Sequence, residues 1–417
     1  MNILKRGMGI TEFGDLISVE KRVLDRVSCK AYHSVTAMKH YKLESVFGQS
    51  SYVISSDRVS AAVTRTGGHL APVTFKLGRR SIRPFAIAPW WNEKPLSTMP
   101  ALLRVLRGDF FCLPFGGNAA VHAGEAHPPH GETSNSRWRF GDCTSTNDEI
   151  TLQLTLDTAI RPGHVRKRIT LVRGQTAVYQ EHVISGMSGP MSLGHHATLK
   201  FPDQVGAGRI STSASVHRQV FPEPMELPEQ RGYSCLKPGA VFSDLSSVPT
   251  ITGEAADVSR YPARRGFEDL VLLAADPQLA VAWSAVAFPA QGYVWFSLRD
   301  PQVLASTVLW ISNAGRHYPP WNGRHFNVMG IEDITGFFHY GLAESAAPND
   351  LSERGIKTHL LLKPRQPLSV RYIMGLAAIP KDFERVRAIL IDDGSVTLVS
   401  DNDITVNTPI HTGFLRR

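Results

Sequence analysis

Apolar and polar residues alternate along most of this chain of 417 residues. Residues 150–156 read Ile-Thr-Leu-Gln-Leu-Thr-Leu, the period of two that places one face of a β-strand in a core. Glycine, proline, asparagine and aspartate separate such segments, and short strands spaced in this way predict an all-β protein, built as a large antiparallel sandwich or barrel. The predicted strands are 51–55, 60–64, 150–156, 165–172, 177–184, 270–274, 280–283, 293–298, 303–311 and 368–374.

Three segments depart from the alternating pattern. Residues 1–35 carry apolar residues at helical spacing, which predicts a helical N-terminal extension, and residues 381–390 could form a second helix. Residues 203–265 are rich in serine, proline and glutamate and predict long loops at one edge of a site. We therefore expect an extension over 1–35, one β domain over 36–392 and a C-terminal tail over 393–417.

The bulk composition is that of an ordinary globular protein, with 42% hydrophobic and 20% charged residues. No apolar run approaches the roughly 20 residues that a membrane span needs, and no apolar segment typical of a signal peptide follows the first residues. The four cysteines lie far apart without a paired motif, which favours reduced thiols. These features predict a cytoplasmic protein without a membrane partner.

The formal net charge of +8 raises the question of nucleic acid. The basic residues occur only in small groups, without the interleaved aromatics or finger spacings of a nucleic-acid-binding module. We expect no nucleic-acid partner. A basic surface that attracts anionic metabolites fits the charge equally well.

A histidine follows two prolines in the segment Pro128-Pro129-His130-Gly131. The prolines fix their φ angles and the glycine permits a sharp bend, so the imidazole would be presented at a loop or at a strand end. This placement suits a functional histidine and an ordinary loop histidine alike.

Two adjacent histidines lie in the predicted strand around Leu193 to Leu199. Neighbouring side chains of a strand point to opposite faces, so His195 would share a face with apolar residues and His196 a face with polar ones. His196 is therefore the better candidate to line a cleft, where an imidazole can act as a general acid near neutral pH. A structural role for both histidines remains the alternative.

An acidic residue lies in a late apolar run, at Gly330-Ile331-Glu332-Asp333. A carboxylate in such company must be solvated in a cleft or paired, and that environment raises its pKa toward the range that suits a general base. Glu332 is the strongest catalytic candidate. Two imidazoles and a carboxylate together could transfer protons at a sugar ring.

A metal site is a competing use for these groups. His122, His127, His130 and Glu132 lie within eleven residues of one another. No HExxH motif is present, and adjacent histidines on a strand are poor ligands for one ion. We expect no metal and no other cofactor, although a metal-dependent sugar-processing enzyme stays open as an alternative.

The order of five motifs resembles that of the galactose mutarotase-like (aldose 1-epimerase) superfamily. The motifs are Gly67-Gly68-His69 with Leu113-Pro114-Phe115-Gly116-Gly117, then His130-Gly131-Glu132 with Trp138, and last Gly194-His195-His196 with Gly330-Ile331-Glu332. The resemblance extends over about residues 50–375 and implies a β-supersandwich. The second histidine motif, His195-His196-Ala197-Thr198-Leu199, departs from the Asn-His-Ser/Thr-Tyr-Phe pattern of that family.

What the resemblance implies is an isomerase of carbohydrate metabolism that interconverts anomers of an aldose, with Glu332 as base, His196 as acid and His130 at the ring oxygen. The implied partner is a small sugar, bound by a monomer or homodimer. A non-catalytic carbohydrate-binding protein on the same fold is the alternative. The residues expected to bind the sugar are Arg80, Glu132, Trp138, His195, Asp269 and Trp321.

Overall fold

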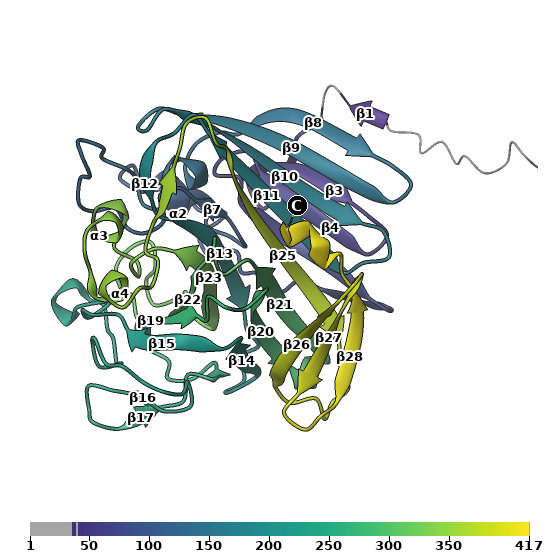
Figure 1. The fold of residues 1–417 in the computed structure, drawn as a ribbon. Helices are drawn as coiled ribbons and strands as arrows, with labels where there is room; N and C mark the ends of the chain where they lie inside the picture. The colour runs from purple at the N-terminus through teal and green to yellow at the C-terminus, as the bar shows by residue number, and fades with distance from the viewer. Residues whose placement is uncertain (1–35, 39–40, 417) are drawn as a thin grey trace, which may run out of the picture.

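Two antiparallel sheets face each other in the computed structural model, which describes residues 36–38 and 41–416 (Figure 1). The larger sheet has ten strands in the order β1-β8-β9-β10-β11-β25-β21-β20-β14-β18. Their bounds are β1 Thr36–Met38, β8 Arg139–Ser145, β9 Glu149–Thr158, β10 Gly163–Val172, β11 Ala177–Ser185, β25 Leu368–Ala378, β21 Tyr293–Arg299, β20 Ala282–Phe288, β14 Gly208–Thr212 and β18 Arg260–Tyr261.

The smaller of the two facing sheets has six strands, in the order β15-β19-β22-β23-β13-β7. Their bounds are β15 Ser215–Val220, β19 Phe267–Ala275, β22 Ser306–Asn313, β23 Val328–Thr335, β13 Leu193–Lys200 and β7 Phe111–Cys112. The structure also has a separate five-stranded sheet, made of β2 Glu44–Val46, β3 Gln49–Ser55, β4 Val59–Thr64, β5 Leu70–Leu77 and β6 Arg80–Ile82.

Small elements complete the fold. Two short pairs are β12 Gly189–Met191 with β24 Leu360–Leu362, and β16 Val248–Pro249 with β17 Ala255–Ala256. The helices are α2 Ala101–Val105, α3 Leu342–Ala346 and α4 Asp350–Glu353, and the 3-10 turns are η1 Glu132–Ser134, η2 Pro228–Gln230, η3 Pro289–Gln291 and η4 Thr412–Arg416. No helix in the described segments has the length and hydropathy that a bilayer span requires.

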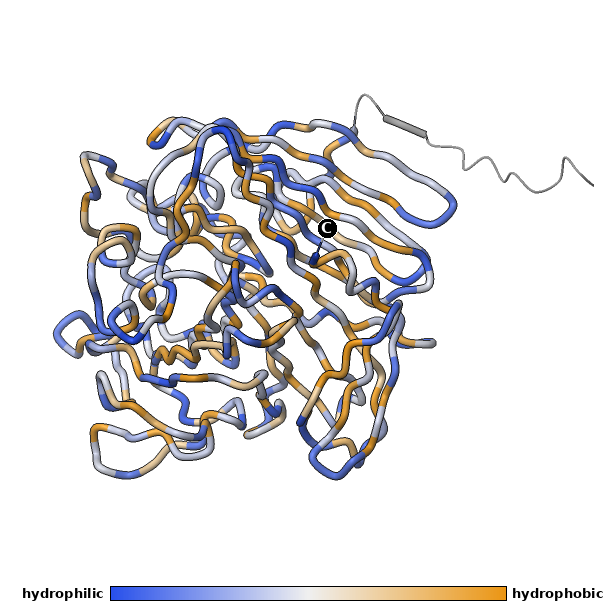
Figure 2. Tube along the Cα trace, in the orientation of Figure 1, coloured by the Kyte–Doolittle hydropathy of each residue, from blue (hydrophilic) through white to orange (hydrophobic). Residues whose placement is uncertain are grey.

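The buried apolar residues follow the alternation along the strands. In the six-stranded sheet, Val271, Leu273 and Leu309 point toward the large sheet and belong to the main core. Their neighbours Leu270 and Trp310 point the other way, into a second core under α2. Hydrophobic and hydrophilic residues alternate along the strands in Figure 2, and the hairpin tips are hydrophilic. Both faces of this sheet are therefore buried.

The predicted all-β class and its ten strands are confirmed, since each predicted segment lies in or overlaps an observed strand. The predicted helix over 381–390 is wrong. Residues 386–392 form β26 (Val386–Asp392), which pairs with β27 (Ser395–Ser400) and β28 (Thr405–Pro409) in a three-stranded sheet. Val386 and Ile389 pack there against Val396 and Leu398, so cross-strand packing overrides the helical spacing.

The predicted extension, the predicted C-terminal boundary and the predicted loop segment differ in how they appear in the structure. The helix predicted over 1–35 lies outside the described residues. The boundary predicted after residue 392 falls between β26 and β27, which are paired strands of one sheet. Residues 203–265 are mainly loops with the short strands β14 to β18, and Met225 of this segment reaches the cavity described next.

Candidate functional site

A cavity of about 160 Å³ lies on the α2 side of the six-stranded sheet. Buried side chains of the sheet and of the segment before β7 form its inner part, while partly exposed residues such as Leu103, Met225 and Arg316 lie toward solvent. Its lining is Pro100, Leu102, Leu103, Leu106, Phe110, Pro129, His130, His196, Met225, Leu270, Trp310, Arg316, Trp321, Glu332 and His339. Most of these residues are apolar, so the few polar groups stand out.

Glu332 and His196 are directly opposite each other on the paired strands β23 and β13. Directly opposite side chains of an antiparallel pair lie on the same face and in contact. His196 Nε2 lies 3.0 Å from Glu332 Oε1, and the two side chains are only 5% and 2% exposed. His196 Nδ1 lies 3.1 Å from the hydroxyl of Thr198 on the same face. The sheet register thus builds an acid–base pair into the cavity.

Burial sets the charge of this pair. It raises the pKa of Glu332 well above its ordinary value and lowers the pKa of His196 to about 3, because a dry site disfavours both charged forms. Burial therefore favours the form of the pair in which the carboxyl group keeps a proton beside a neutral imidazole. Glu332 Oε2 has no hydrogen-bond partner among the described residues, although it is buried. An unpaired buried oxygen is costly and is available to a ligand.

The turn that carries His130 is shaped by Gly131. His130 has a φ of 59° and Gly131 a φ of 75°, and a Cβ atom on Gly131 would lie 1.9 Å from the carbonyl oxygen of Leu113. Only glycine fits that close approach. The His130 ring stacks edge-on against Phe110, lies 5.1 Å from the His196 ring, and has Nδ1 3.4 Å from Cys112 Sγ. Burial lowers its pKa well below the ordinary value.

Asn135 ties this turn to α2. Its amide nitrogen donates to the carbonyls of Pro129 and Gly131, at 2.8 and 2.7 Å, on either side of His130. Its carboxamide oxygen accepts a hydrogen bond from the N–H of Leu102 at 2.9 Å. Asn135 therefore fixes the His130 turn and the α2 wall of the cavity relative to each other.

Arg316 supplies the cationic group of the cavity. Its guanidinium lies over the rings of Trp321 and Trp310, with distances of 4.6 and 5.4 Å to the ring centroids. Its Nε pairs with Glu226 and lies 3.9 Å from Glu268, whose pKa burial raises to about 7. The two Nη atoms have no hydrogen-bond partner among the described residues. They are free to bind oxygen atoms of a ligand.

The structure brings together four of the nine predicted site residues, namely Glu332, His196, His130 and Trp321. Sequence reasoning missed Arg316 and His339, which come from the loops after β22 and β23. The His339 ring lies 5.1 Å from that of His130. The histidine follows the strand of Glu332 by only four residues, a signal that could have indicated it.

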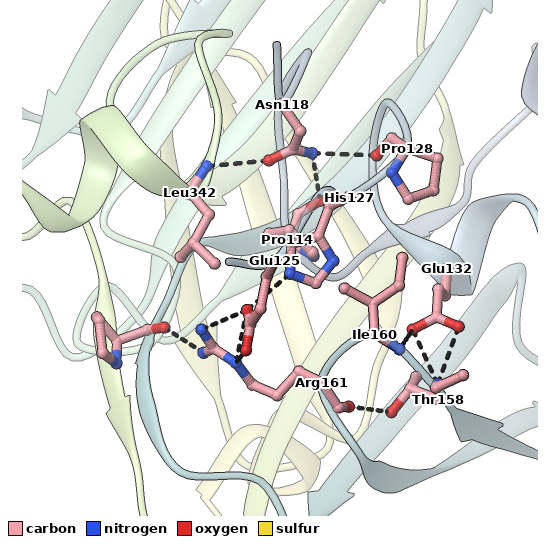
Figure 3. Close-up of polar contacts among 12 residues, drawn as sticks. Pro114, Asn118, Glu125, His127, Pro128, Glu132, Thr158, Ile160, Arg161 and Leu342 are labelled. Carbon is pink, nitrogen blue, oxygen red and sulfur yellow. Dashed lines mark hydrogen bonds and ion pairs between the residues drawn. The ribbon is translucent and has the colours of Figure 1, made fainter. Parts of the chain in front are cut away.

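Glu132 lies close in sequence to His130 but does not line the cavity, and its carboxylate faces the backbone beside Ile160 (Figure 3). Its carboxylate accepts hydrogen bonds from the N–H groups of Ala159 and Ile160, at 3.0 to 3.1 Å, and so holds the turn between β9 and β10. Its predicted sugar contact is therefore not seen, because the oxygens of its carboxylate are occupied by backbone donors.

Arg80 and Trp138 also lie away from the cavity. Arg80 is exposed at β6 and donates to the carbonyls of Gln291 and Gly292, at an edge of the molecule. Trp138 is fully buried, and its indole N–H donates to the carbonyl of Thr133 at 2.9 Å. Both side chains hold the fold together instead of lining the cavity.

His195 and Asp269 lie on strands of the site but on other surfaces. His195 points between the sheets, where Nδ1 contacts Asp109 at 2.9 Å. Asp269 accepts from the N–H groups of Cys235 and Leu236, at 3.0 and 2.9 Å, and lines a separate small cavity. The neighbour of Asp269, Glu268, is the residue of β19 that points to the cavity side, where it accepts a hydrogen bond from the Trp310 indole.

The histidines considered as metal ligands do not converge. His127 contacts Glu125 at 2.9 Å, and Glu125 is bound by Arg161 (Figure 3), whereas His130 belongs to the cavity. Within residues 36–38 and 41–416 no group of three or more histidine, cysteine, aspartate or glutamate side chains is placed to hold a metal ion.

Comparison with known proteins gives structural relatives only. No family model and no curated protein matches the sequence. Solved structures do match: a candidate aldose 1-epimerase from Klebsiella pneumoniae has a TM-score of 0.56 at 13% identity, over 86% of this chain and 90% of that one. A candidate mutarotase from Salmonella typhimurium has a TM-score of 0.53 at 13% identity, over 85% and 99%.

A third structure, a candidate aldose 1-epimerase from Escherichia coli, has a TM-score of 0.52 at 14% identity, over 80% of this chain and all of the other. At these identities the likeness concerns the fold. The chain has the galactose mutarotase-like fold, as the order of its motifs predicts.

Proposed function

We propose that this protein is an aldose 1-epimerase-like isomerase, which interconverts the α and β anomers of a sugar. The observation that carries the proposal is the Glu332–His196 pair, a carboxyl group and an imidazole 3.0 Å apart in a cavity. Anomer exchange needs one proton removed from the C1 hydroxyl and one delivered to the ring oxygen. Both oxygens are bonded to C1, so two adjacent groups can reach them together.

In the proposed reaction the sugar binds with C1 facing the pair. The proton of the pair first passes from Glu332 to His196 as the sugar binds. Glu332 then takes the proton of the C1 hydroxyl, and the His196 imidazolium gives its proton to the ring oxygen as the bond between C1 and that oxygen breaks. Rotation about the C1–C2 bond of the open-chain aldehyde and the reverse transfers close the other anomer. The pair holds one proton before and after the cycle, so no cofactor and no net acid or base is consumed.

The surrounding residues support this chemistry. Sugar hydroxyls would provide partners for Glu332 Oε2 and stabilise the ionised form of the pair, which burial disfavours. His130, whose ring lies 5.1 Å from that of His196, would polarise the ring oxygen, and the apolar side chains of the lining would contact the carbon atoms of a pyranose. Cys112, Cys143 and Cys235 are free and buried, as suits the cytoplasmic location that we propose.

Polarimetry tests the proposal. Freshly dissolved α-glucose, α-galactose and α-galacturonic acid should approach rotational equilibrium faster with the protein than without it, for at least one sugar. The acceleration should disappear in Glu332→Gln, which keeps the shape of the side chain but cannot accept the proton. No acceleration by the wild-type protein for any aldose, together with thermal stabilisation by one of them, would contradict the isomerase and favour the non-catalytic sugar-binding protein.

A further inference from the structure

A groove of about 570 Å³ adjoins the cavity. The segment around α2 separates the two, since Leu102 and Leu103 line the cavity while Ala101 and Arg104 line the groove. The loop after β22 is shared in the same way, because Trp321 lines the cavity while its neighbours on either side line the groove. A ligand that fills the cavity therefore has a second surface next to it.

The groove has an aromatic platform. The Trp91 side chain is 36% exposed, and the ring of Phe47, 38% exposed, stands edge-on to it with 5.2 Å between the centroids. Large aromatic side chains exposed as a pair are the usual surface on which sugar rings stack. The platform lies at the rim of a hollow that also offers the amide groups of Gln49 and Asn322.

The turn that carries Phe47 is held in an unfavourable conformation. Phe47 and Gly48 have φ angles of 46° and 74°, in the hairpin between β2 and β3, and a bulky side chain rarely adopts a positive φ. The buried guanidinium of Arg107 donates to the carbonyls of Val46 and Phe47, each at 3.1 Å, and so fixes the turn. A two-residue hairpin of type I′ requires a positive φ at both positions, and Arg107 thus holds Phe47 in place beside Trp91.

The charge of the groove selects the ligand. Lys94 and Arg137 are exposed, and neither forms an ion pair or a side-chain hydrogen bond within the described residues. Arg324 is paired with Glu93, with Nη2 and Oε2 2.8 Å apart, so its charge is balanced. Two unpaired cations beside an aromatic platform suit a chain of rings that carry negative charge.

We propose that this groove binds an acidic oligosaccharide, such as a chain of uronate units, whose terminal sugar reaches the adjoining cavity. The reach into the cavity rests on the proposed function, as does the choice of a glycan, and the groove site itself does not. Glu93 is paired with Arg324, so the charges of Lys94 and Arg137 are left to attract an anionic ligand. The choice of a glycan over a nucleic acid follows from the adjoining cavity, whose acid–base pair suits a sugar.

Titration calorimetry with trigalacturonate tests the groove site, with maltotriose as the neutral ligand and an eight-residue oligothymidylate as the nucleic acid. We expect trigalacturonate to bind more tightly than either, and its affinity to fall with added salt. Trp91→Ala and the double variant Lys94→Ala/Arg137→Ala should each weaken it by about tenfold. The matched control is Arg79→Ala/Lys363→Ala, which removes two exposed cations that line neither hollow and should leave affinity unchanged.

Several results would overturn the groove site: no binding of trigalacturonate, equal binding of maltotriose, tighter binding of oligothymidylate, or wild-type affinity in both groove variants. Failure of the proposed function has a different signature. Binding of trigalacturonate is measured separately from isomerisation. If no sugar is isomerised while that binding persists and depends on Trp91, the groove site holds and the isomerase does not.

Discussion

The two faces of the six-stranded sheet use the same residue types in opposite ways. On the cavity face, Glu332 is opposite His196, and one strand position further the inter-sheet face places Asp333 opposite His195. Asp333 is bound by Arg299 at 2.7 Å and by the hydroxyls of four further residues, Ser284, Ser297, Thr307 and Tyr372. Within the described residues Glu332 has His196 as its single side-chain partner, at 3.0 Å, and its second oxygen is unpaired.

The carboxyl groups of Asp333 and Glu332 differ in the side chains that surround them. A carboxylate with a guanidinium and four hydroxyl donors is satisfied and holds the sheets together, whereas a carboxyl group with one imidazole in an apolar cavity retains unused hydrogen-bonding capacity. The inter-sheet pair therefore stabilises the fold, and the cavity pair is free for chemistry.

The largest effect should come from Asp333→Asn. The amide cannot neutralise Arg299, which is 1% exposed, and breaking a buried ion pair by removing one partner costs roughly 3–5 kcal/mol. Urea denaturation should show this loss in the free energy of unfolding. A loss below about 1 kcal/mol would mean that the inter-sheet network does not carry the stability attributed to it.

The next largest effects should come from His196→Asn and His195→Asn, which change one residue on each face of the sheet. Loss of the general acid should slow anomer exchange by about 10²-fold or more, with little change in unfolding. His195→Asn should instead lower stability, because Asp109 loses one of its two side-chain partners, the imidazole at 2.9 Å, and keeps only Gln180 in the interior. Polarimetry and denaturation of both variants check this. Equal loss of turnover in the two variants would contradict the distinction.

Gly131→Ala should disturb the cavity face through the His130 turn. The new Cβ meets the Leu113 carbonyl at 1.9 Å, so we expect a loss of about 1–3 kcal/mol in stability and a slower reaction. The control is Gly124→Ala, at a similar positive φ of 84° but with no atom within 4 Å of the new Cβ. Gly124→Ala introduces the same backbone strain without the steric clash. A wild-type rate of anomer exchange in Gly131→Ala would exclude a role for this turn.

The smallest effect concerns pH. The pKa of Glu332 is higher in the folded chain than its ordinary 4.5, so the folded state holds a proton that the unfolded state releases as the pH rises. Its contribution to stability is complete below pH 4.5 and is lost as the pH rises toward the folded pKa. Glu332→Gln removes this dependence. The free energy of unfolding of the variant, relative to that of the wild-type protein, should therefore increase above pH 4.5 by about 1 kcal/mol per pH unit. A constant difference from pH 5 to 8 would show that burial does not raise this pKa.

The sequence predicted the parts of the site that depend on strand periodicity. The alternation around His195 and His196 placed Leu193, Ala197 and Leu199 in the main core, and so turned His196 toward the cavity side. The same reasoning could not choose between Glu268 and Asp269, since β19 has apolar residues on both faces and only the packing of the sheets shows which face is the cavity. Strand periodicity therefore predicts the orientation of a side chain only where one face of the strand is distinctly apolar.

Other members of the site depend on loops. Arg316 and His339 come to the cavity from turns after β22 and β23, whose paths follow from tertiary packing. Glu132, beside His130 in sequence, turns away because two backbone N–H groups of the next hairpin bind it. Proximity in sequence to a functional histidine therefore does not predict a place in the cavity.

The most direct test of the central claim measures activity and stability on the same samples of Glu332→Gln and Asp333→Asn. We expect Glu332→Gln to abolish anomer exchange while its free energy of unfolding is at least that of the wild-type protein. We expect Asp333→Asn to lose several kcal/mol of stability but to keep anomer exchange in the fraction of molecules that is folded. A fully active Glu332→Gln, or loss of exchange only in proportion to unfolding in both variants, would contradict the central claim.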